Sequence, residues 1–189
     1  HGSEIKIITS QDAGKGLSAE SDLGEFDGMI TAERGIPLAV FYADCTPILL
    51  FDPKQKVIAA VHSGWKGTLA RIGRKAVQMM RKNFGCDPAD ILASFGPSIK
   101  QCHFEVEGNV FVQFCENFGT RNLKNTVVSG DKFFVDTDDL NRQQLLEEGL
   151  KEENIAVCDA CTFCQHNVFY SHRADGGITG RMCAVIELI

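Results

Sequence analysis

The sequence predicts a layered fold of the α/β or α+β class, in which helices pack on a mixed β-sheet. Three observations lead to this prediction. Short apolar runs rich in β-branched residues recur along the chain, amphipathic stretches with helical spacing lie between them, and the two kinds do not alternate strictly. The length of 189 residues and the hydrophobic content of 44% are sufficient for one sizeable core.

The expected strands are apolar runs bounded by turn residues. Residues 57–61 (VIAAV) form the clearest of them, and the turn signal Asp52-Pro53-Lys54 separates this run from the one before it. In chain order, the expected strands cover residues 4–9, 37–43, 48–51, 57–61, 91–95, 132–135, 155–157 and 183–189.

The expected helices follow the amphipathic stretches. Residues 66–83 have apolar side chains at helical spacing, and Gly85 is a suitable stop signal. A second helix is expected over residues 106–118. A third begins at a cap formed by Asp136 or Thr137.

Composition limits the class of partner. The net charge of −6, from 19 basic and 25 acidic residues, argues against a nucleic acid or an anionic membrane. No apolar run has the length of a membrane span, and no signal peptide is visible. Eight cysteines, several of them in core-like strands, indicate reduced thiols rather than a disulfide framework. We therefore expect a cytoplasmic protein whose partners are small molecules.

Two of the expected strands end on residues that can bind a metal. The run 38–44 ends on Cys45, and the run 57–61 delivers His62 to a turn just before a helix. Together with His1, these residues make a plausible three-ligand zinc set, which leaves the fourth tetrahedral position open as a catalytic zinc requires. Taken alone, a buried structural cysteine and a hydrogen-bonded core histidine are the commoner roles of such residues.

Four further residues carry groups suited to catalysis or binding. Asp44 is able to orient a ligand or to act as an acid or base, and its alternative is a turn carboxylate. Lys66 lies at an expected helix start, where an anion is favoured. Arg173 and Arg181 are able to hold anions bidentately, and the alternative for all three basic residues is a solvated surface position.

A third group of residues, Cys158, Cys161 and Cys164, has the spacing C-x₂-C-x₂-C. An iron–sulfur cluster usually needs four thiolates, so the fourth would have to come from elsewhere, such as Cys102 or Cys183. Because that ligand is missing from the motif, plain thiols are the favoured interpretation.

Four blocks of the sequence together resemble the YfiH family, whose members are described as multicopper polyphenol oxidases, as laccase-like proteins and as zinc-type purine nucleoside phosphorylases. The blocks are ADCTPILLFDP, VIAAVHSGWKGT, FGPSIKQCHFEV and CTFCQHNVFYSHRADGGITGRM. The resemblance implies an αββα sandwich with a mixed sheet, and His1, Cys45 and His62 as the metal ligands.

The sequence departs from the family pattern at several places. Lys66 stands where arginine is usual, and Ala174 where a second arginine is frequent, and both changes bear on anion binding. The family's portion before its Q-V-H-G block is absent. We therefore expect residues 1–189 to form a single YfiH-like domain that lacks this segment.

The resemblance implies a zinc-dependent purine nucleoside phosphorylase acting on adenosine, inosine, guanosine or methylthioadenosine, with adenosine deaminase as an associated activity. Zinc lowers the pKa of a bound water to about 7, which suits deamination. Cys45, Asp44 and His62 are the expected catalytic residues, with Asp44 as a proton shuttle. Phosphate is expected near Lys66 or Arg173, with Arg181 as a further anion-binding residue. The expected partners are a nucleoside and phosphate, in a monomer or weak homodimer.

Three alternatives remain open at this point. Copper-dependent polyphenol oxidation is disfavoured because the chain has five histidines and no His-x-His pair, although a site of two histidines and one cysteine is able to bind copper. Amide hydrolysis with Cys45 as nucleophile, in peptidoglycan-precursor editing, is the second. The third is a zinc-stabilised binding module, which chelation would unfold.

Overall fold

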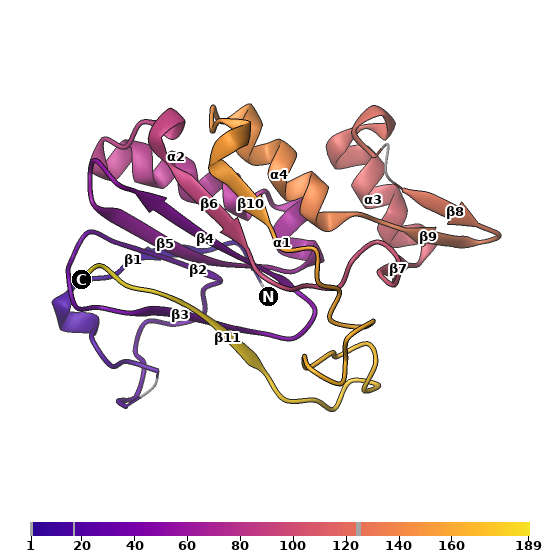
Figure 1. The fold of residues 1–189 in the computed structure, drawn as a ribbon, viewed down its shortest axis with the longest axis horizontal. Helices are drawn as coiled ribbons and strands as arrows, with labels where there is room; N and C mark the ends of the chain where they lie inside the picture. The colour runs from indigo at the N-terminus through magenta and orange to yellow at the C-terminus, as the bar shows by residue number, and fades with distance from the viewer. Residues whose placement is uncertain (1, 17, 124–125) are drawn as a thin grey trace.

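The centre of the fold is a six-stranded mixed sheet with the order β1-β2-β5-β4-β6-β10 (Figure 1). The computed structural model describes residues 2–16, 18–123 and 126–189. The two outer pairs, β1 with β2 and β6 with β10, are parallel, and the pairs between them are antiparallel. The strands of this sheet are β1 (Ile5–Ile7), β2 (Gly28–Thr31), β4 (Thr46–Asp52), β5 (Val57–Ser63), β6 (Leu92–Phe95) and β10 (Ile155–Val157).

Helices cover one face of this sheet (Figure 1). They are α1 (Trp65–Leu69), α2 (Ile72–Phe84) and α4 (Thr137–Glu147). The apolar side of α2 buries Ile72 and Met80 in one cluster with Ile48 of β4 and Leu145 of α4. Because apolar burial is the main favourable term in folding, this cluster fixes the helical layer on the sheet.

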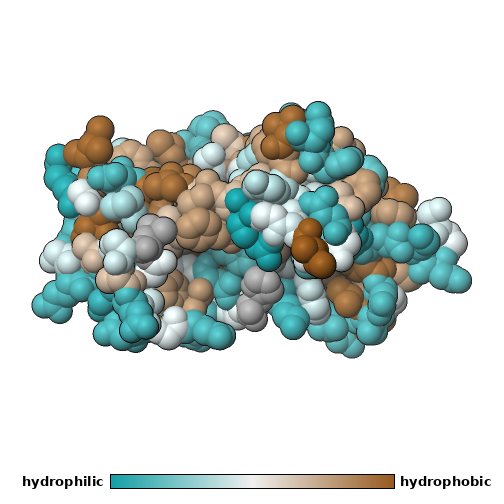
Figure 2. Space-filling model, turned by 90° about the horizontal axis from the view of Figure 1, so that it is seen from below, coloured by the Kyte–Doolittle hydropathy of each residue, from teal (hydrophilic) through white to brown (hydrophobic). Residues whose placement is uncertain are grey.

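A two-stranded antiparallel sheet covers the other face of β5. It consists of β3 (Leu38–Tyr42) and β11 (Met182–Ile186), and Leu38 packs with Ile58 of β5. All seven residues of β5 are therefore buried, which explains its continuous apolar run. The outer side of the small sheet exposes Phe41 and Val185, on a face that mixes hydrophilic and hydrophobic residues (Figure 2).

A smaller unit lies at the end of the helical layer. It contains α3 (Gly108–Phe118) and the three-stranded sheet β7 (Glu105–Val106), β9 (Lys132–Phe134) and β8 (Val127–Ser129). Phe114 is fully buried, and the rings of Phe111 and Phe133 stack with centroids 4.2 Å apart. Leu140 of α4 belongs to the same cluster and joins this unit to the main helical layer.

A buried polar layer joins the underside of α4 to the ends of β4 and β5. The Thr46 hydroxyl donates to Asp138 Oδ1 at 2.6 Å, and the Ser63 hydroxyl donates to Asn141 Oδ1 at 3.0 Å. These four residues are at most 5% exposed, so their polar groups satisfy one another away from water. The layer lies where β4 begins and β5 ends.

The predicted layered α/β fold with a mixed sheet is confirmed. Of the four layers in the expected αββα sandwich, the described residues form one helical layer and the two stacked sheets. The expected single helix over residues 66–83 was wrong, because Arg71 adopts the left-handed conformation with φ of 58° and separates α1 from α2. The short strands β2, β7 and β8 were not expected. The predicted cap at Asp136 is confirmed, since its side chain accepts from the Asp139 N–H.

No helix among the described residues has both the length and the apolar character to cross a membrane.

Candidate functional site

The register of β4 and β5 places Cys45 and His62 on the same face of the large sheet. Thr46 pairs with Ser63 and Pro47 with His62, and successive side chains alternate between faces. Because Thr46 and Ser63 face α4, Cys45 and His62 face the small sheet instead. The two side chains are diagonal neighbours across the strand pair, a position from which they can interact.

Gly64 provides the space between the two groups. A Cβ atom at this position would lie 3.1 Å from Cys45 Sγ and 3.9 Å from His62 Cε1. The thiol and the imidazole therefore border one small volume, and glycine keeps that volume open.

Asp27 orients His62. The ring of His62 is buried, and its Nδ1 lies 2.9 Å from Asp27 Oδ1. The other carboxylate oxygen of Asp27 accepts from the backbone N–H of Gly2. Burial opposes the charge on Asp27, but the hydrogen bonds from Gly2 and His62 outweigh it and lower the pKa of the carboxyl. Asp27 is therefore ionised at neutral pH and ties the His62 ring to the start of the chain.

His1, the expected third ligand, lies outside the described residues. Its neighbour Gly2 is held by the same carboxylate that holds His62.

Burial raises the pKa of the Cys45 thiol to about 11, and the carboxylates of Asp44 and Asp27 add to the effect. The thiol of the metal-free protein is therefore protonated near neutral pH. A thiol of this kind needs a cation or a base beside it before it becomes a ligand or a nucleophile.

A cavity of about 600 Å³ borders Asp27 and the start of the chain. Its lining includes Gly2, Glu4, Glu25 and Phe26. The volume is comparable with that of small-molecule sites. The carboxylates of Glu4, Glu25 and Asp27 in this lining disfavour an anion, so we expect a phosphate group to bind outside the cavity.

Arg181 and Lys66 are placed differently with respect to Cys45. Arg181 is exposed, lies directly before β11 and donates from Nη1 to the carbonyls of Thr179 and Gly180 at 3.0 and 2.9 Å. Its positive charge opposes the larger effect of burial, which raises the pKa of the Cys45 thiol. Lys66 is exposed in α1, with Nζ 5.5 Å from the centroid of the Trp65 ring. Because α1 has only five residues, its N-terminus lacks the aligned dipoles of a longer helix.

Asp44 and Arg173 belong to one hydrogen-bonded unit. Asp44 is 8% exposed and has a φ of 76°, a conformation that costs a residue other than glycine about 1–3 kcal/mol. Its Oδ1 accepts from the Thr162 hydroxyl at 2.6 Å, and its Oδ2 accepts from the Arg173 backbone N–H at 2.7 Å. The Arg173 guanidinium donates to the carbonyls of His103 and Glu105 at 3.2 and 3.0 Å. These contacts anchor the loop of residues 158–181 next to Cys45.

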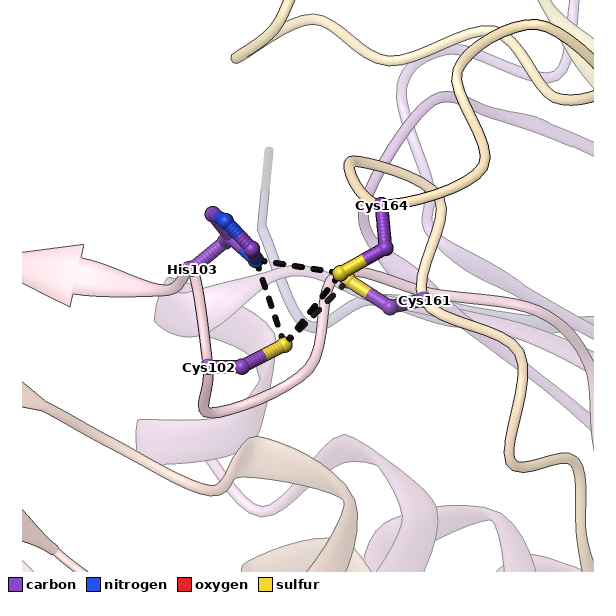
Figure 3. Close-up of side chains that lie close together, drawn as sticks. All are labelled: Cys102, His103, Cys161 and Cys164. Atoms are coloured by element: carbon purple, nitrogen blue, oxygen red, sulfur yellow. Dashed lines mark hydrogen bonds between the residues drawn. The ribbon is translucent and has the colours of Figure 1, made fainter.

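A second group of metal-binding side chains lies on this loop and on the turn after β6. Cys102, His103, Cys161 and Cys164 each offer one ligand atom, and these atoms lie within 4.8 Å of one another (Figure 3). All eight cysteines of the chain are free thiols. The group could hold a metal ion.

The composition of this group differs in part from the sequence prediction. The sequence favoured plain thiols and named Cys102 and Cys183 only as possible fourth ligands of a cluster. The structure places Cys102 beside Cys161 and Cys164, and Cys158 and Cys183 are not members of the group. Its fourth ligand is the imidazole of His103, which the sequence interpretation missed. The signal was adjacency, because His103 directly follows Cys102 in the chain. One imidazole and three thiols do not match the four thiolates that an iron–sulfur cluster usually takes.

Comparison with known proteins places the whole chain in one family. A family model described as "Multi-copper polyphenol oxidoreductase laccase" matches residues 1–189. The chain is 35% identical over 189 residues to "Purine nucleoside phosphorylase YlmD" of Bacillus subtilis, an alignment that spans 100% of this chain and 68% of that protein.

Two further relatives extend the comparison. The chain is 35% identical over 165 residues to "Adenosine deaminase RL5" of an unknown prokaryotic organism, covering 86% of this chain and 62% of that protein. The crystal structure of the hypothetical protein YfiH of Bacillus licheniformis superposes with a TM-score of 0.93 at 32% identity, over 100% of this chain and 72% of that one.

Proposed function

The chain belongs to the YfiH family of multi-copper polyphenol oxidoreductase laccase proteins, and we propose that it is a zinc-dependent purine nucleoside phosphorylase. Adenosine, inosine, guanosine and methylthioadenosine are the proposed nucleosides, and phosphate is the second substrate. One observation carries the proposal: Cys45 and His62 converge on a single open volume in a chain that is 35% identical to a purine nucleoside phosphorylase.

The residues at this site fit a zinc ion. Thiolate and imidazole are both ligands that zinc takes in proteins. The contact between His62 Nδ1 and a carboxylate is typical of a metal-binding histidine, which then uses its other ring nitrogen as the ligand. His1 is the proposed third ligand, which the attachment of Gly2 to Asp27 supports. When bound, zinc would supply a Lewis acid that stabilises negative charge on the reacting groups.

The surrounding residues divide into anion-binding and positioning roles. Arg181 is the proposed phosphate ligand, because it directly precedes Met182, which pairs with Tyr42 three residues before Cys45, and because its positive charge favours the Cys45 thiolate. Lys66 contributes at the outer edge of the site. Asp44, with hydrogen bonds at both oxygens, suits the anchoring of the loop better than proton transfer. Arg173 is engaged with backbone carbonyls and stabilises the same loop.

Turnover of inosine and adenosine, with and without phosphate, tests the proposal. The zinc-loaded protein should release the free base only when phosphate is present, and ribose 1-phosphate should form in equal amount. Equal base release without phosphate would rule out phosphorolysis. Cys183→Ala, a change at an exposed cysteine outside the site, is the matched control for variants of Cys45.

Adenosine deamination is a second candidate, favoured by the relative named as an adenosine deaminase. A Lewis-acid site of the same composition suits the addition of water to a purine ring. Ammonia release from adenosine in the absence of phosphate would identify this activity. A protein that releases adenine but no ammonia would exclude it.

A further inference from the structure

We propose that Cys102, His103, Cys161 and Cys164 form a closed, four-coordinate zinc site, here called the metal clamp, separate from the site at Cys45 and His62. The clamp has a structural role, because all four positions around the ion would be filled by protein ligands and none would be open to a substrate. This inference does not depend on the proposed phosphorylase activity.

Four of the six ligand–ligand distances within the clamp lie close to the edges of a zinc tetrahedron, and all six are within 4.8 Å. With Zn–S bonds of about 2.3 Å and Zn–N bonds of about 2.0 Å, sulfur atoms lie about 3.8 Å apart, and sulfur and nitrogen about 3.5 Å apart. Cys102 Sγ is 3.7 Å from both Cys161 Sγ and Cys164 Sγ. His103 Nδ1 is 3.2 Å from Cys102 Sγ and 3.3 Å from Cys164 Sγ.

The same distances count against a disulfide within the clamp. A disulfide bond holds its sulfur atoms about 2.05 Å apart, far closer than these thiols. Three sulfur atoms and one imidazole nitrogen face one another here, which is the arrangement of four ligands around an ion and not of a bonded cysteine pair (Figure 3).

Contacts around the clamp hold two of its ligands in place. The backbone N–H of Lys100 donates to Cys161 Sγ at 3.4 Å, a bond that favours the thiolate form needed by a metal. The ring of His103 stacks on Phe163, with centroids 4.1 Å apart and planes 18° from parallel. Such surrounding contacts normally accompany metal ligands, because they fix the ligand's orientation before the ion binds.

The clamp joins two segments that have little regular structure of their own. Residues 158–181, all of which the structure describes, contain neither helix nor strand beyond an isolated bridge of Cys161 to Ser98. A loop of this length without secondary structure is uncommon unless it is functional or constrained. The clamp would constrain it by tying Cys161 and Cys164 to the turn that carries Cys102 and His103.

The position of the clamp connects it to the site at Cys45. Thr162 directly follows Cys161, and its hydroxyl donates to Asp44, the residue before Cys45. The Arg173 guanidinium donates to the carbonyl of His103, a clamp ligand. A bound ion would therefore hold Thr162 and Arg173 in place on Asp44.

Zinc stoichiometry in four proteins tests the proposal: the unchanged chain, Cys164→Ser, Cys45→Ala and the control Cys183→Ser. Cys164 and Cys183 are both exposed cysteines, so the two serine variants are matched. The unchanged chain and the control should bind two zinc ions, and Cys164→Ser and Cys45→Ala one each. If the site at Cys45 holds no metal, the unchanged chain should bind one ion and Cys164→Ser none, so failure of the proposed function is distinguishable.

Cobalt substitution provides a second measurement that needs no variant in the clamp. The intensity of thiolate-to-cobalt charge transfer rises with the number of sulfur ligands, so the clamp should contribute three times the signal of a site with one thiolate. Cys45→Ala should therefore keep about three quarters of the total charge-transfer intensity.

Two results would contradict the clamp. A Cys164→Ser variant that binds as much zinc as the unchanged chain would overturn the proposal. Protein that is isolated without metal, and in which two of the clamp thiols have formed a disulfide, would also overturn the proposal.

Discussion

The two groups of metal-binding side chains are held by different kinds of structure. Cys45 and His62 lie at the ends of adjacent strands in the middle of the large sheet, where strand register decides the face that each side chain takes. Cys161 and Cys164 lie on a loop without strands, and Cys102 and His103 lie on a turn. Strand register therefore brings Cys45 and His62 together without a metal, whereas we expect a bound ion to stabilise the second group by joining its two segments.

The largest expected effect is that of Cys45→Ala on activity. Changes to residues around a metal ligand typically cost 10–100-fold, so loss of the ligand itself should lower phosphate-dependent turnover by at least ~100-fold. The fold should remain, because Cys45 lies directly before β4 and not within it. Turnover and thermal unfolding of the same preparation measure both effects. Full activity in this variant would remove Cys45 from the site.

Asp27→Asn should have the next largest effect. The substitution keeps the size of the side chain but removes the charge that faces His62 Nδ1. We expect zinc affinity at the Cys45 site to fall about 10–100-fold, with the clamp unaffected. Zinc titration of a Cys164→Ser background, in which only the first site binds, isolates the change. Unaltered affinity there would mean that Asp27 serves only to hold Gly2.

Arg181→Ala should weaken phosphate binding more than Lys66→Ala does. A hydrogen bond to a charged group contributes about 1.5–3 kcal/mol, so the KM for phosphate should rise by about tenfold or more in the first variant. The second should change it by less than about threefold, because Lys66 Nζ lies 5.5 Å from the centroid of the Trp65 ring, at the outer edge of the site. Initial rates over a range of phosphate concentrations give both values. The reverse order would move the phosphate to the α1 side of the site.

Thr162→Val tests the link between the two regions. The variant removes the hydroxyl that donates to buried Asp44 at 2.6 Å and keeps the shape of the side chain. Leaving a charged oxygen without this donor should lower the free energy of unfolding by about 1–3 kcal/mol. Urea denaturation measures the change. An unaltered free energy would show that the loop does not depend on this contact.

The smallest expected effect is a pH dependence of stability from Asp27. The pKa of this carboxyl lies below its ordinary 3.8, because the hydrogen bonds from Gly2 and His62 outweigh the effect of burial. A lowered pKa stabilises the folded state above the ordinary value, and this contribution is lost as the pH falls through the folded-state pKa. The difference in unfolding free energy between the unchanged chain and Asp27→Asn should be constant above about pH 5 and should shrink below 3.8.

The sequence was sufficient to predict that Cys45 follows one apolar strand and that His62 lies near the end of another. In the structure, β3 ends at Tyr42, three residues before Cys45, and His62 is the last residue but one of β5. The run that forms β5 is buried throughout, and such a run is recognisable without knowledge of its partners. Asp27 was not predictable, because its contact with His62 depends on the pairing of β2 with β5, which are distant in the chain. The polar residues before Asp27 give no sign of that pairing.

Two other features could not be predicted from the sequence, each for a different physical reason. The break between α1 and α2 rests on the left-handed conformation of Arg71, a residue type that normally favours helix, so tertiary contacts override local preference. The clamp combines neighbours in the chain, Cys102 and His103, with cysteines about sixty residues away. The C-x₂-C-x₂-C spacing pointed to Cys158 as a third member beside Cys161 and Cys164. The path of the loop instead places His103 next to these two cysteines.

Anomalous scattering at the zinc edge, from a crystal grown with zinc, would locate each bound ion. We expect two peaks, one between Cys45 and His62 and one enclosed by the four residues of the clamp. A map with no peak between Cys45 and His62 would contradict the proposed catalytic metal.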